Sequence, residues 1–172
     1  MEDVPAPAGA AGAGRDRGTR EPRQGRGDPV ITLAVKRLDP SVPLPAYARE
    51  GDAGLDLHAA HDLTLEPGAR GVVGTGLAVA IPTGYAGLVL PRSGLALTQG
   101  LTILNTPGLV DSGYRGEVKI LLVNHDAKSV TVQRGQRVAQ LVIQRVEQVK
   151  LAEMSELPPS ERGAAGFGST GA

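Results

Sequence analysis

Between Val30 and Val149 the sequence is divided into short apolar runs by turn-forming residues at about every tenth position. Val, Leu and Ile dominate the runs, and Pro-Gly, Pro-Thr-Gly and Arg-Gly-Gln separate them. Short β-branched runs at this spacing are typical of an all-β sandwich or barrel, and they leave little room for long helices. The sequence therefore predicts an all-β domain.

Five stretches carry this strand pattern. They are VITLAVKRL (30–38), the segment 63–95, EVKILLVNHD (117–126), KSVTVQRGQ (128–136) and RVAQLVIQRV (137–146). Within residues 63–95, the Pro-Gly, Gly and Pro-Thr-Gly signals are predicted to separate one strand from the next. One short helix is expected at residues 93–97, where Ser93 is placed to cap the first turn.

The two ends of the chain differ in composition from this middle part. Residues 1–28 contain five Arg and five acidic residues among Gly, Ala and Pro. Such a segment buries too little apolar surface to offset the entropy of ordering it, so we expect a disordered arm. The alternative is a basic arm for nucleic acid, which the interleaved acids disfavour. Residues 29–149 form the expected β-domain, and residues 150–172 are expected to be a polar connector and a Gly-rich lid.

Charge and composition exclude several classes of function. Eighteen Lys and Arg balance eighteen Asp and Glu, so the chain as a whole does not attract nucleic acid or a membrane surface. There is no Cys, which excludes disulfides and thiolate metal sites, and the three His residues are expected on surface loops. No stretch has the apolar length of a membrane helix and no signal peptide is visible. We expect a soluble cytoplasmic protein with no nucleic-acid or membrane partner.

Three stretches of the β-domain contain polar residues that plain strands do not need. Asp56 lies between two leucines, so strand alternation places it on the opposite face from both; the alternative is an ordinary solvent-facing acid. Arg92 precedes the expected helix start, where guanidinium and free N–H groups can bind phosphate; the alternative is a capped turn with a surface Arg. Gln140 interrupts an apolar run, so its amide either holds a neighbouring strand or faces a ligand.

Two further stretches combine turn residues with groups that bind or activate. Asp111 begins a predicted tight turn between two strands, in LVDSGYRG; it is either a turn former or a base that activates water beside a phosphate. Tyr114 lies at the exit of this turn, which favours an exposed stacking role over a core role. In residues 162–172, Gly, Ser and Thr surround Phe167, the only Phe of the chain. This end is either an anion-wrapping segment or a loose terminus.

The joint order of these five stretches resembles the five motifs of the trimeric dUTPase family, the dUTP nucleotidohydrolases. The matching segments are AGLDL (53–57), PRSGLA (91–96), GLVDSGYRGEV (108–118), GQRVAQLV (135–142) and RGAAGFGSTG (162–171). The resemblance covers residues 30–171, and its third and fifth motifs are the most specific. It implies a jelly-roll-like β-barrel of the β-clip type that assembles as a homotrimer, with each active site shared among three chains.

The resemblance also implies a reaction, in which dUTP is split into dUMP and pyrophosphate with Mg²⁺ carried mainly by the substrate phosphates and by water. Such an activity limits uracil incorporation into DNA and supplies dUMP for thymidylate synthesis. Asp111 is then the residue that activates the attacking water at the α-phosphate, and Asp56 supports it. The residues implied in substrate binding are Arg92, Ser93, Gly94, Asn105, Tyr114, Lys119, Gln140, Arg162, Phe167, Ser169 and Thr170.

The family pattern assigns the binding residues to parts of the nucleotide. Asn105 and the hairpin backbone read the uracil, Tyr114 packs on the deoxyribose, and the tail closes over the nucleotide with Phe167 stacked on the base. Ala165 stands where the family usually has Gly, which costs about 1 kcal/mol if that position needs a positive φ. Two alternatives stay open: a dCTP deaminase of the same fold, and a catalytically silent binding protein. Both are expected to lack the tail or the Asp111 turn present here.

Overall fold

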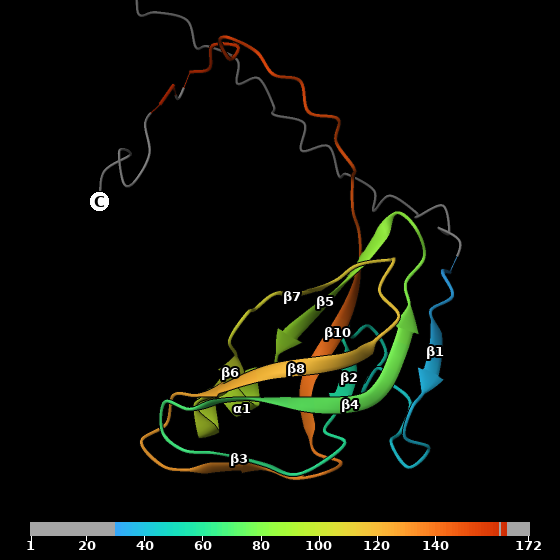
Figure 1. Cartoon of the computed structure of the whole chain (residues 1–172), viewed down its shortest axis with the longest axis vertical. Helices are drawn as coiled ribbons and strands as arrows, with labels where there is room; N and C mark the ends of the chain where they lie inside the picture. Colours follow the sequence, from blue (N-terminus) through green and yellow to red (C-terminus); the bar gives the residue numbers. More distant parts are fainter. Residues whose placement is uncertain (1–29, 162, 165–172) are drawn as a thin grey trace, which may run out of the picture. The chain divides into compact units, whose positions relative to one another are not determined.

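The computed structural model describes residues 30–161 and 163–164, and the chain divides into two units, Met1–Ile31 and Thr32–Ala172. Of the first unit only Val30 and Ile31 are described, and both are exposed. The second unit contains every described strand and helix (Figure 1). The arm at residues 1–28 and the boundary at residue 150 stay predictions.

Strands dominate the second unit, as the turn spacing predicts. In chain order the elements are β1 (Ala34–Arg37), β2 (Leu55–His58), β3 (Leu63–Leu65), β4 (Arg70–Ala80), β5 (Tyr85–Pro91), α1 (Ser93–Gln99), β6 (Leu101–Ile103), β7 (Gly108–Val110), β8 (Glu117–Asn124), β9 (Val130–Val132) and β10 (Arg137–Arg145). They form a sheet of order β1-β4-β8-β6, a second of order β2-β10-β5-β7, and the pair β3-β9. The all-β prediction is confirmed, whereas the jelly-roll closure and the trimer stay predictions.

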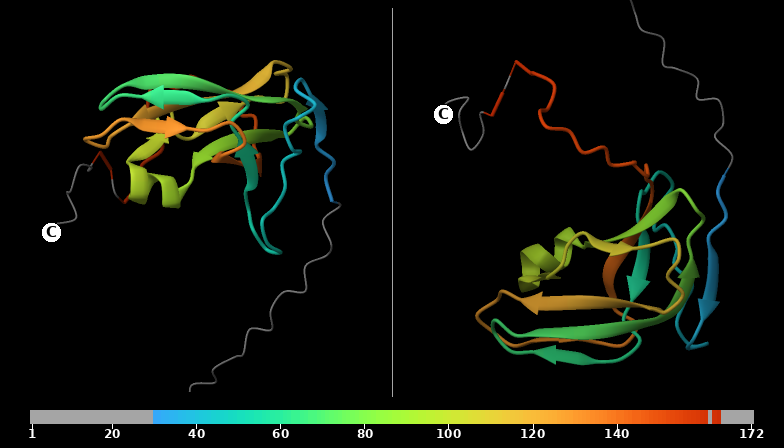
Figure 2. Two further views of the ribbon diagram at one scale, coloured as in Figure 1. Left: turned by 90° about the horizontal axis from the view of Figure 1, so that it is seen from below. Right: turned by 45° about the horizontal axis from the view of Figure 1, so that its top comes forward.

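One aliphatic core joins these sheets. Neighbouring strands pair antiparallel, so Val73 of β4 lies opposite Ile120 of β8 and both are buried, whereas Val72 lies opposite Leu121 on the other face. The pair β3-β9 packs next to β4 (Figure 2). The largest fully buried apolar side chains are Leu57, Leu77, Leu101, Ile120, Leu122, Leu141, Val73, Val132 and Val138. Only 2% of the chain is aromatic, and Val, Leu and Ile accordingly fill this core.

The glycines of the segment 63–95 act differently from one another. Gly68 and Gly84 have φ values of 73° and 84° and end strands at turns, as predicted. Gly74 and Gly76 do not end a strand, because β4 continues from Arg70 to Ala80 through both of them. The prediction of a strand break at these two glycines is therefore wrong: they form a bulge, where the pairing of β4 with β8 shifts between Gly74 and Ala78.

The predicted helix is present, but its first residue is not the predicted one. Ser93 is the first residue of α1 and Arg92 occupies the N-cap position, with no side-chain cap hydrogen bond. The predicted capping role of Ser93 is therefore wrong. The helix ends at Gly100, whose φ of 58° lets its N–H bond to the carbonyl of Leu95. Because Ser93 does not cap α1, its hydroxyl can serve the cavity beside it.

The segment that follows β10 contains no strand or helix among its described residues. Its apolar side chains Val149, Leu151, Met154 and Leu157 are all exposed. The connector and lid expected at residues 150–172 stay a prediction. None of the helices in the described part of the chain is long and apolar enough to cross a membrane.

Candidate active site

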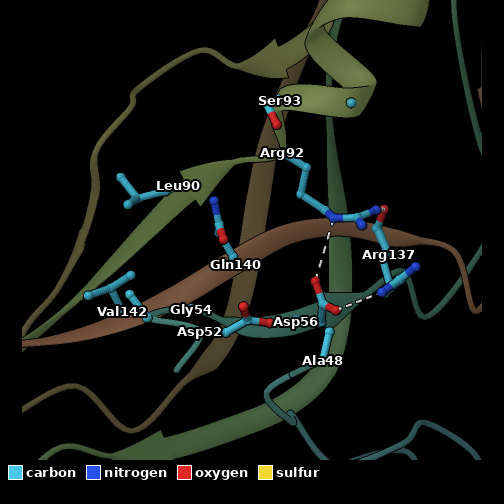
Figure 3. A pocket seen from close by; sticks show the side chains of 12 residues that line it. Ala48, Asp52, Gly54, Asp56, Leu90, Arg92, Ser93, Arg137, Gln140 and Val142 are labelled. Atoms are coloured by element: carbon cyan, nitrogen blue, oxygen red, sulfur yellow. Dashed lines mark hydrogen bonds and ion pairs between the residues drawn. The ribbon is translucent and has the colours of Figure 1, made fainter. Parts of the chain in front are cut away.

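Asp56 of β2 lies at the centre of an ion-pair cluster. Its Oδ1 is 3.5 Å from Nε of Arg92, and its Oδ2 is 3.0 Å from Nη1 of Arg137 (Figure 3). The side chain of Asp56 is only 15% exposed. The alternative reading of Asp56 as an ordinary solvent-facing acid is therefore wrong. One carboxylate faces two guanidinium groups, so guanidinium N–H groups are left over for an anionic ligand.

The two arginines are also held to each other. Arg92 follows β5, and Arg137 begins β10, which pairs with both β5 and β2. Nη1 of Arg92 donates a hydrogen bond of 3.0 Å to the carbonyl oxygen of Arg137. The antiparallel pairing of three strands thus brings together residues that are far apart in the sequence. The remaining guanidinium N–H groups of both residues are available to oxygen atoms of a ligand.

Gln140 lies beside this cluster. Its position is compatible with both predicted roles of its amide, which are to hold a neighbouring strand and to face a ligand. In β10 it pairs with Asp56 of β2, and its Nε2 donates to the carbonyl oxygen of Pro91 at 3.1 Å. The residue also lines the cavity described below. Gly54 packs against it so closely that a Cβ at this position would lie 2.6 Å from Oε1 of Gln140. This contact explains why a residue without a side chain precedes β2.

These groups surround a cavity of about 370 Å³. Its lining residues are Ala48, Asp52, Ala53, Gly54, Asp56, Leu90, Arg92, Ser93, Gly94, Arg137, Gln140 and Val142. Figure 3 shows them contributed by the loop before β2 and by β2, β5, β10 and the start of α1. We call this the cationic pocket after its two arginines, whose charges are balanced by Asp52 and Asp56. Five of the predicted site residues therefore meet here.

The tight turn between β7 and β8 builds a second pocket, of about 200 Å³. It is lined by Leu109, Val110, Asp111, Tyr114, Glu117, Val118 and Lys119, and we call it the hairpin pocket. Asp111 directly follows β7, and its carbonyl accepts from the N–H of Tyr114 at 3.0 Å. The predicted turn is thus confirmed. The Tyr114 side chain is 44% exposed, so it does not belong to the core.

Within the hairpin pocket, a hydrogen bond orients Tyr114 and an ion pair joins Lys119 to Glu117. The hydroxyl of Tyr114 donates to the carbonyl oxygen of Glu117 at 2.9 Å. Nζ of Lys119 lies 4.0 Å from a carboxylate oxygen of Glu117. Asp111 is exposed, and among residues 30–161 nothing donates a hydrogen bond to its carboxylate. The surroundings therefore leave Asp111 available to a water molecule, in contrast to the twice-paired Asp56.

The described chain does not bring all predicted site residues together. No described residue lines both pockets, so Asp56 and Asp111 belong to separate sites of this chain. Asn105 is exposed between β6 and β7 and lines neither pocket. The predicted tail residues lie outside the described residues; they are Arg162, Phe167, Ser169 and Thr170.

Three charged residues of these pockets were missed by the sequence reasoning: Asp52, Arg137 and Glu117. Arg137 occurs in the GQRVAQLV segment, three residues before Gln140. The sequence could have identified it, because it is a basic residue at the start of a strand that contains a candidate ligand-binding amide. Glu117 follows the Arg-Gly pair of the turn, and nothing in the local sequence marks it as a site residue. Its contact with the N–H of Gly76 depends on β4, which is remote in sequence. Arg137 and Glu117 are placed by strand pairing, whereas Asp52 lies in the loop before β2, where its carboxylate accepts from the N–H of Arg49 at 2.9 Å.

His58 adjoins the ion-pair cluster and is not a loop residue as predicted, because it belongs to β2. Burial lowers the pKa of His58 below its ordinary value of 6.5, and the nearby Arg137 and Arg92 act in the same direction. Asp56 opposes them by raising the pKa. The imidazole is therefore held in its neutral form to a lower pH than a free His. His125 is exposed, as expected of a surface residue.

The donors of the two pockets bear on how Mg²⁺ can be held. Within the described residues no group of three or more His, Asp or Glu comes together to hold a metal ion. Asp56 is already engaged by two guanidinium groups, which leaves Asp111 and Glu117 as acids of the hairpin pocket. Mg²⁺ typically binds one or two carboxylates together with waters and substrate phosphates. The pockets fit an ion that is carried by a phosphate chain.

Comparison with known proteins gives one consistent family. The dUTPase family model matches residues 41–171. The deoxyuridine 5'-triphosphate nucleotidohydrolase of Thermobifida fusca (strain YX) is 56% identical over 143 residues, which cover 83% of this chain and 80% of that protein. The protein of the same name from Mycobacterium tuberculosis (strain ATCC 25177 / H37Ra) is 54% identical over 146 residues, covering 81% of this chain and 95% of the other.

Solved structures of phage enzymes have the same fold. The dUTPase of Staphylococcus bacteriophage 80alpha with dUPNHPP superposes with a TM-score of 0.78 and 33% identity, covering 83% of this chain and all of that one. A mutant dUTPase from phage phi11 of S. aureus, described with a structural Mg(II) ion, has a TM-score of 0.70 and 28% identity over 75% of this chain. Since the family model spans most of the chain and these relatives are more than half identical to it over the aligned residues, the chain belongs to the dUTPase family of nucleotidohydrolases.

Proposed function

We propose that this enzyme hydrolyses dUTP to dUMP and pyrophosphate by attack of an Asp111-activated water on the α-phosphate. The observation that carries the proposal is the cationic pocket, where Arg92 and Arg137 share the single carboxylate of Asp56. A triphosphate carries several negative charges, and a planar guanidinium matches pairs of phosphate oxygens. The names of the bacterial relatives, deoxyuridine 5'-triphosphate nucleotidohydrolase, support the choice of nucleotide.

In this proposal the cationic pocket binds the phosphate chain. Arg92 and Gln140 donate to phosphate oxygens, and Ser93 and Gly94 lie at the exposed start of α1 beside them. Arg137 adds a second guanidinium. Asp56 fixes the direction of both arginines, because it accepts a hydrogen bond from Arg137 and forms an ion pair with Arg92. Mg²⁺ carried by the substrate would supply further positive charge against the phosphates.

The hairpin pocket holds the nucleoside end and the water. Asp111 carries a carboxylate with no described partner, so it can orient a water molecule and accept its proton. The exposed ring of Tyr114 packs on the deoxyribose, Lys119 lines the same pocket, and Asn105 with the hairpin backbone reads the uracil. A rigid wall at the sugar and at the base excludes a 2'-hydroxyl and a 5-methyl group by steric clash.

A homotrimer explains why the two pockets are separate in one chain. The cationic pocket of one chain and the hairpin pocket of a neighbour would complete a single site. An apolar row on the outer face of the β4-β8-β6 sheet supports such an assembly: Val72 lies opposite Leu121, and Leu104 donates its N–H to the carbonyl of Leu121. Val72 and Leu104 are 48% and 45% exposed, an arrangement that a neighbouring chain would bury. The jelly-roll closure of the barrel belongs to the same proposal.

The ends of the chain complete the proposal. Residues 29–149 form the catalytic domain, residues 1–28 are an arm outside it, and residues 150–172 are a connector and lid. Arg162, Ser169 and Thr170 would contact the phosphates while Phe167 stacks on the uracil, which contributes about 1–3 kcal/mol for a base on an aromatic ring. Closure of the lid would exclude bulk water from the reacting phosphate.

The test is pyrophosphate release from dUTP, dTTP, dCTP and UTP, measured with and without Mg²⁺. The proposal expects release from dUTP in the presence of Mg²⁺, and much slower release from the other three. Ammonia release from dCTP would instead identify a deaminase of the same fold. Binding of dUTP without any product would identify a silent binding protein, and either result would overturn the proposal.

A further inference from the structure

Glu117 lines the hairpin pocket, but the reaction above gives its carboxylate no task. We infer that Glu117 is a positioning residue, which fixes the ring of Tyr114 and thereby the discrimination between deoxyribose and ribose. This inference rests on the proposed function of the hairpin pocket. It is carried by two bonds: Oε1 of Glu117 accepts from the N–H of Gly76 at 2.9 Å, and the carbonyl of Glu117 accepts from the hydroxyl of Tyr114 at 2.9 Å.

The first bond closes a gap in the sheet. Gly74 pairs with Lys119 and Ala78 pairs with Glu117, so three residues of β4 face only Val118 of β8. The N–H of Gly76 lies within this bulge, where the regular ladder offers it no acceptor, and its φ of 66° belongs to the left-handed region. A partly buried N–H without an acceptor is unfavourable. The Glu117 carboxylate supplies that acceptor from the neighbouring strand.

Close packing shows that the carboxylate has a defined place over the bulge. A Cβ at Gly74 would overlap Oε1 of Glu117, so the side chain lies directly against the β4 backbone. The Glu117 side chain is only 26% exposed. The bulge is itself anchored on its other side, because the carbonyl of Gly76 accepts from the N–H groups of Leu38 and Asp39. Glu117 is thus bound to a rigid part of the sheet.

The second bond, from the hydroxyl of Tyr114 to the carbonyl of Glu117, connects the position of Glu117 to the hairpin pocket. Tyr114 is exposed on a turn, and its hydroxyl is held by the backbone of Glu117. The backbone of Glu117 pairs with Ala78 at the end of the ladder, and its side chain on Gly76 holds it a second time beside the bulge. Loss of the carboxylate should leave the fold intact, because the buried hydroxyl of Thr75 still donates to the carbonyl of Val118 at 2.7 Å. The expected effect is therefore local, at Tyr114.

The side chain could instead act by charge on Lys119, whose Nζ is 4.0 Å away. An exposed ion pair at this distance contributes little. Reach and charge can be separated by three variants. Glu117→Gln keeps the reach and an acceptor oxygen without the charge, Glu117→Asp keeps the charge without the reach, and Glu117→Ala keeps neither.

The experiment measures kcat and KM for dUTP and UTP with the full chain and its three Glu117 variants. We expect Glu117→Gln to retain the wild-type preference for dUTP. In Glu117→Asp and Glu117→Ala we expect this preference to fall about tenfold, as for the loss of one hydrogen bond. The loss should come from KM, with kcat nearly unchanged. Equal loss in Glu117→Gln and Glu117→Ala, or none in Glu117→Ala, would overturn the inference.

Two further measurements make the outcome unambiguous. Val132→Ala, a buried change in β9 outside the hairpin pocket, controls for reduced stability and should leave the dUTP preference unchanged. Hydrogen exchange of the Gly76 amide needs no substrate: it should be slow in the wild type and Glu117→Gln, and faster in the other two variants. If the wild type does not hydrolyse dUTP, the proposed function fails, and this exchange still decides whether Glu117 holds the bulge.

Discussion

At the scale of single residues, two aspartates with the same chemistry are given different tasks by their neighbours. Asp56 is largely buried and faces two guanidinium groups, so it orients cations. Asp111 is exposed at a turn, and its carboxylate accepts from no group among residues 30–161. A base must be free to accept a proton, whereas a supporting carboxylate must be held in place. The contrast supports the proposal that Asp111 activates the water while Asp56 holds the arginines.

Replacing Asp111 by Asn removes the proton acceptor and keeps the size of the side chain. We expect kcat for dUTP to fall by about three orders of magnitude, because general base catalysis typically contributes that much. Binding of a non-hydrolysable dUTP analogue should remain nearly unchanged in calorimetry. Asp126→Asn, in the turn after β8, is the matched control and should keep full turnover. An Asp111→Asn enzyme with wild-type kcat would remove Asp111 from the proposed mechanism.

His58 predicts a pH dependence of stability. Its pKa in the folded chain lies below 6.5, mainly because of burial, so the unfolded chain binds a proton more readily. The free energy of unfolding therefore rises with pH through the range just below 6.5 and falls on acidification. In urea titrations between about pH 5 and pH 7, His58→Gln should show a flatter dependence than the wild type. His125→Gln, at an exposed position, should keep the wild-type slope; an unchanged slope in His58→Gln contradicts the account.

At the scale of the elements, the local sequence pattern was sufficient to predict a strand where that strand pairs regularly with its neighbours. The strands β8 and β10 were predictable because an apolar run alternates and ends at turn residues. The continuation of β4 through Gly74 and Gly76 was not, because it depends on Glu117 of a strand remote in sequence. The polar residues of single motifs could be predicted as candidate site residues from the local sequence. The pairing of Arg92 and Arg137 around Asp56 could not, because it depends on strands that are remote in sequence.

The bulge of β4 gives a prediction at this scale. In Gly74→Ala the new Cβ would overlap the Glu117 carboxylate, so we expect the free energy of unfolding to fall by about 1–3 kcal/mol, as for other overpacked sites. Gly113→Ala is the matched control, since a Cβ there meets nothing within 4 Å. Adding Glu117→Ala to Gly74→Ala should restore part of the loss, measured as a coupling energy in denaturant titrations. Additive effects of the two changes would contradict this packing.

At the scale of the whole molecule, the proposed trimer links assembly to activity. The apolar row of Val72, Leu121 and Leu104 should be covered by a neighbouring chain. We expect light scattering to give three chains for the wild type, and Val72→Asp to dissociate them, because a buried unpaired charge is costly at an interface. Gln133→Asp, on the exposed turn between β9 and β10, should stay trimeric. A Val72→Asp trimer, or a monomeric wild type with full activity, would contradict the assembly.

The central claim is that one active site combines the cationic pocket of one chain with the hairpin pocket of another. It is tested most directly by mixing two inactive variants, Arg92→Ala and Asp111→Asn, under conditions where chains exchange. Each variant alone lacks one half of every site. In randomly mixed trimers about a quarter of the sites should receive both intact halves, because each half comes intact from one chain in two. The account predicts about a quarter of the wild-type dUTP turnover in an equal mixture. No activity above that of the separate variants would show that each site lies within a single chain.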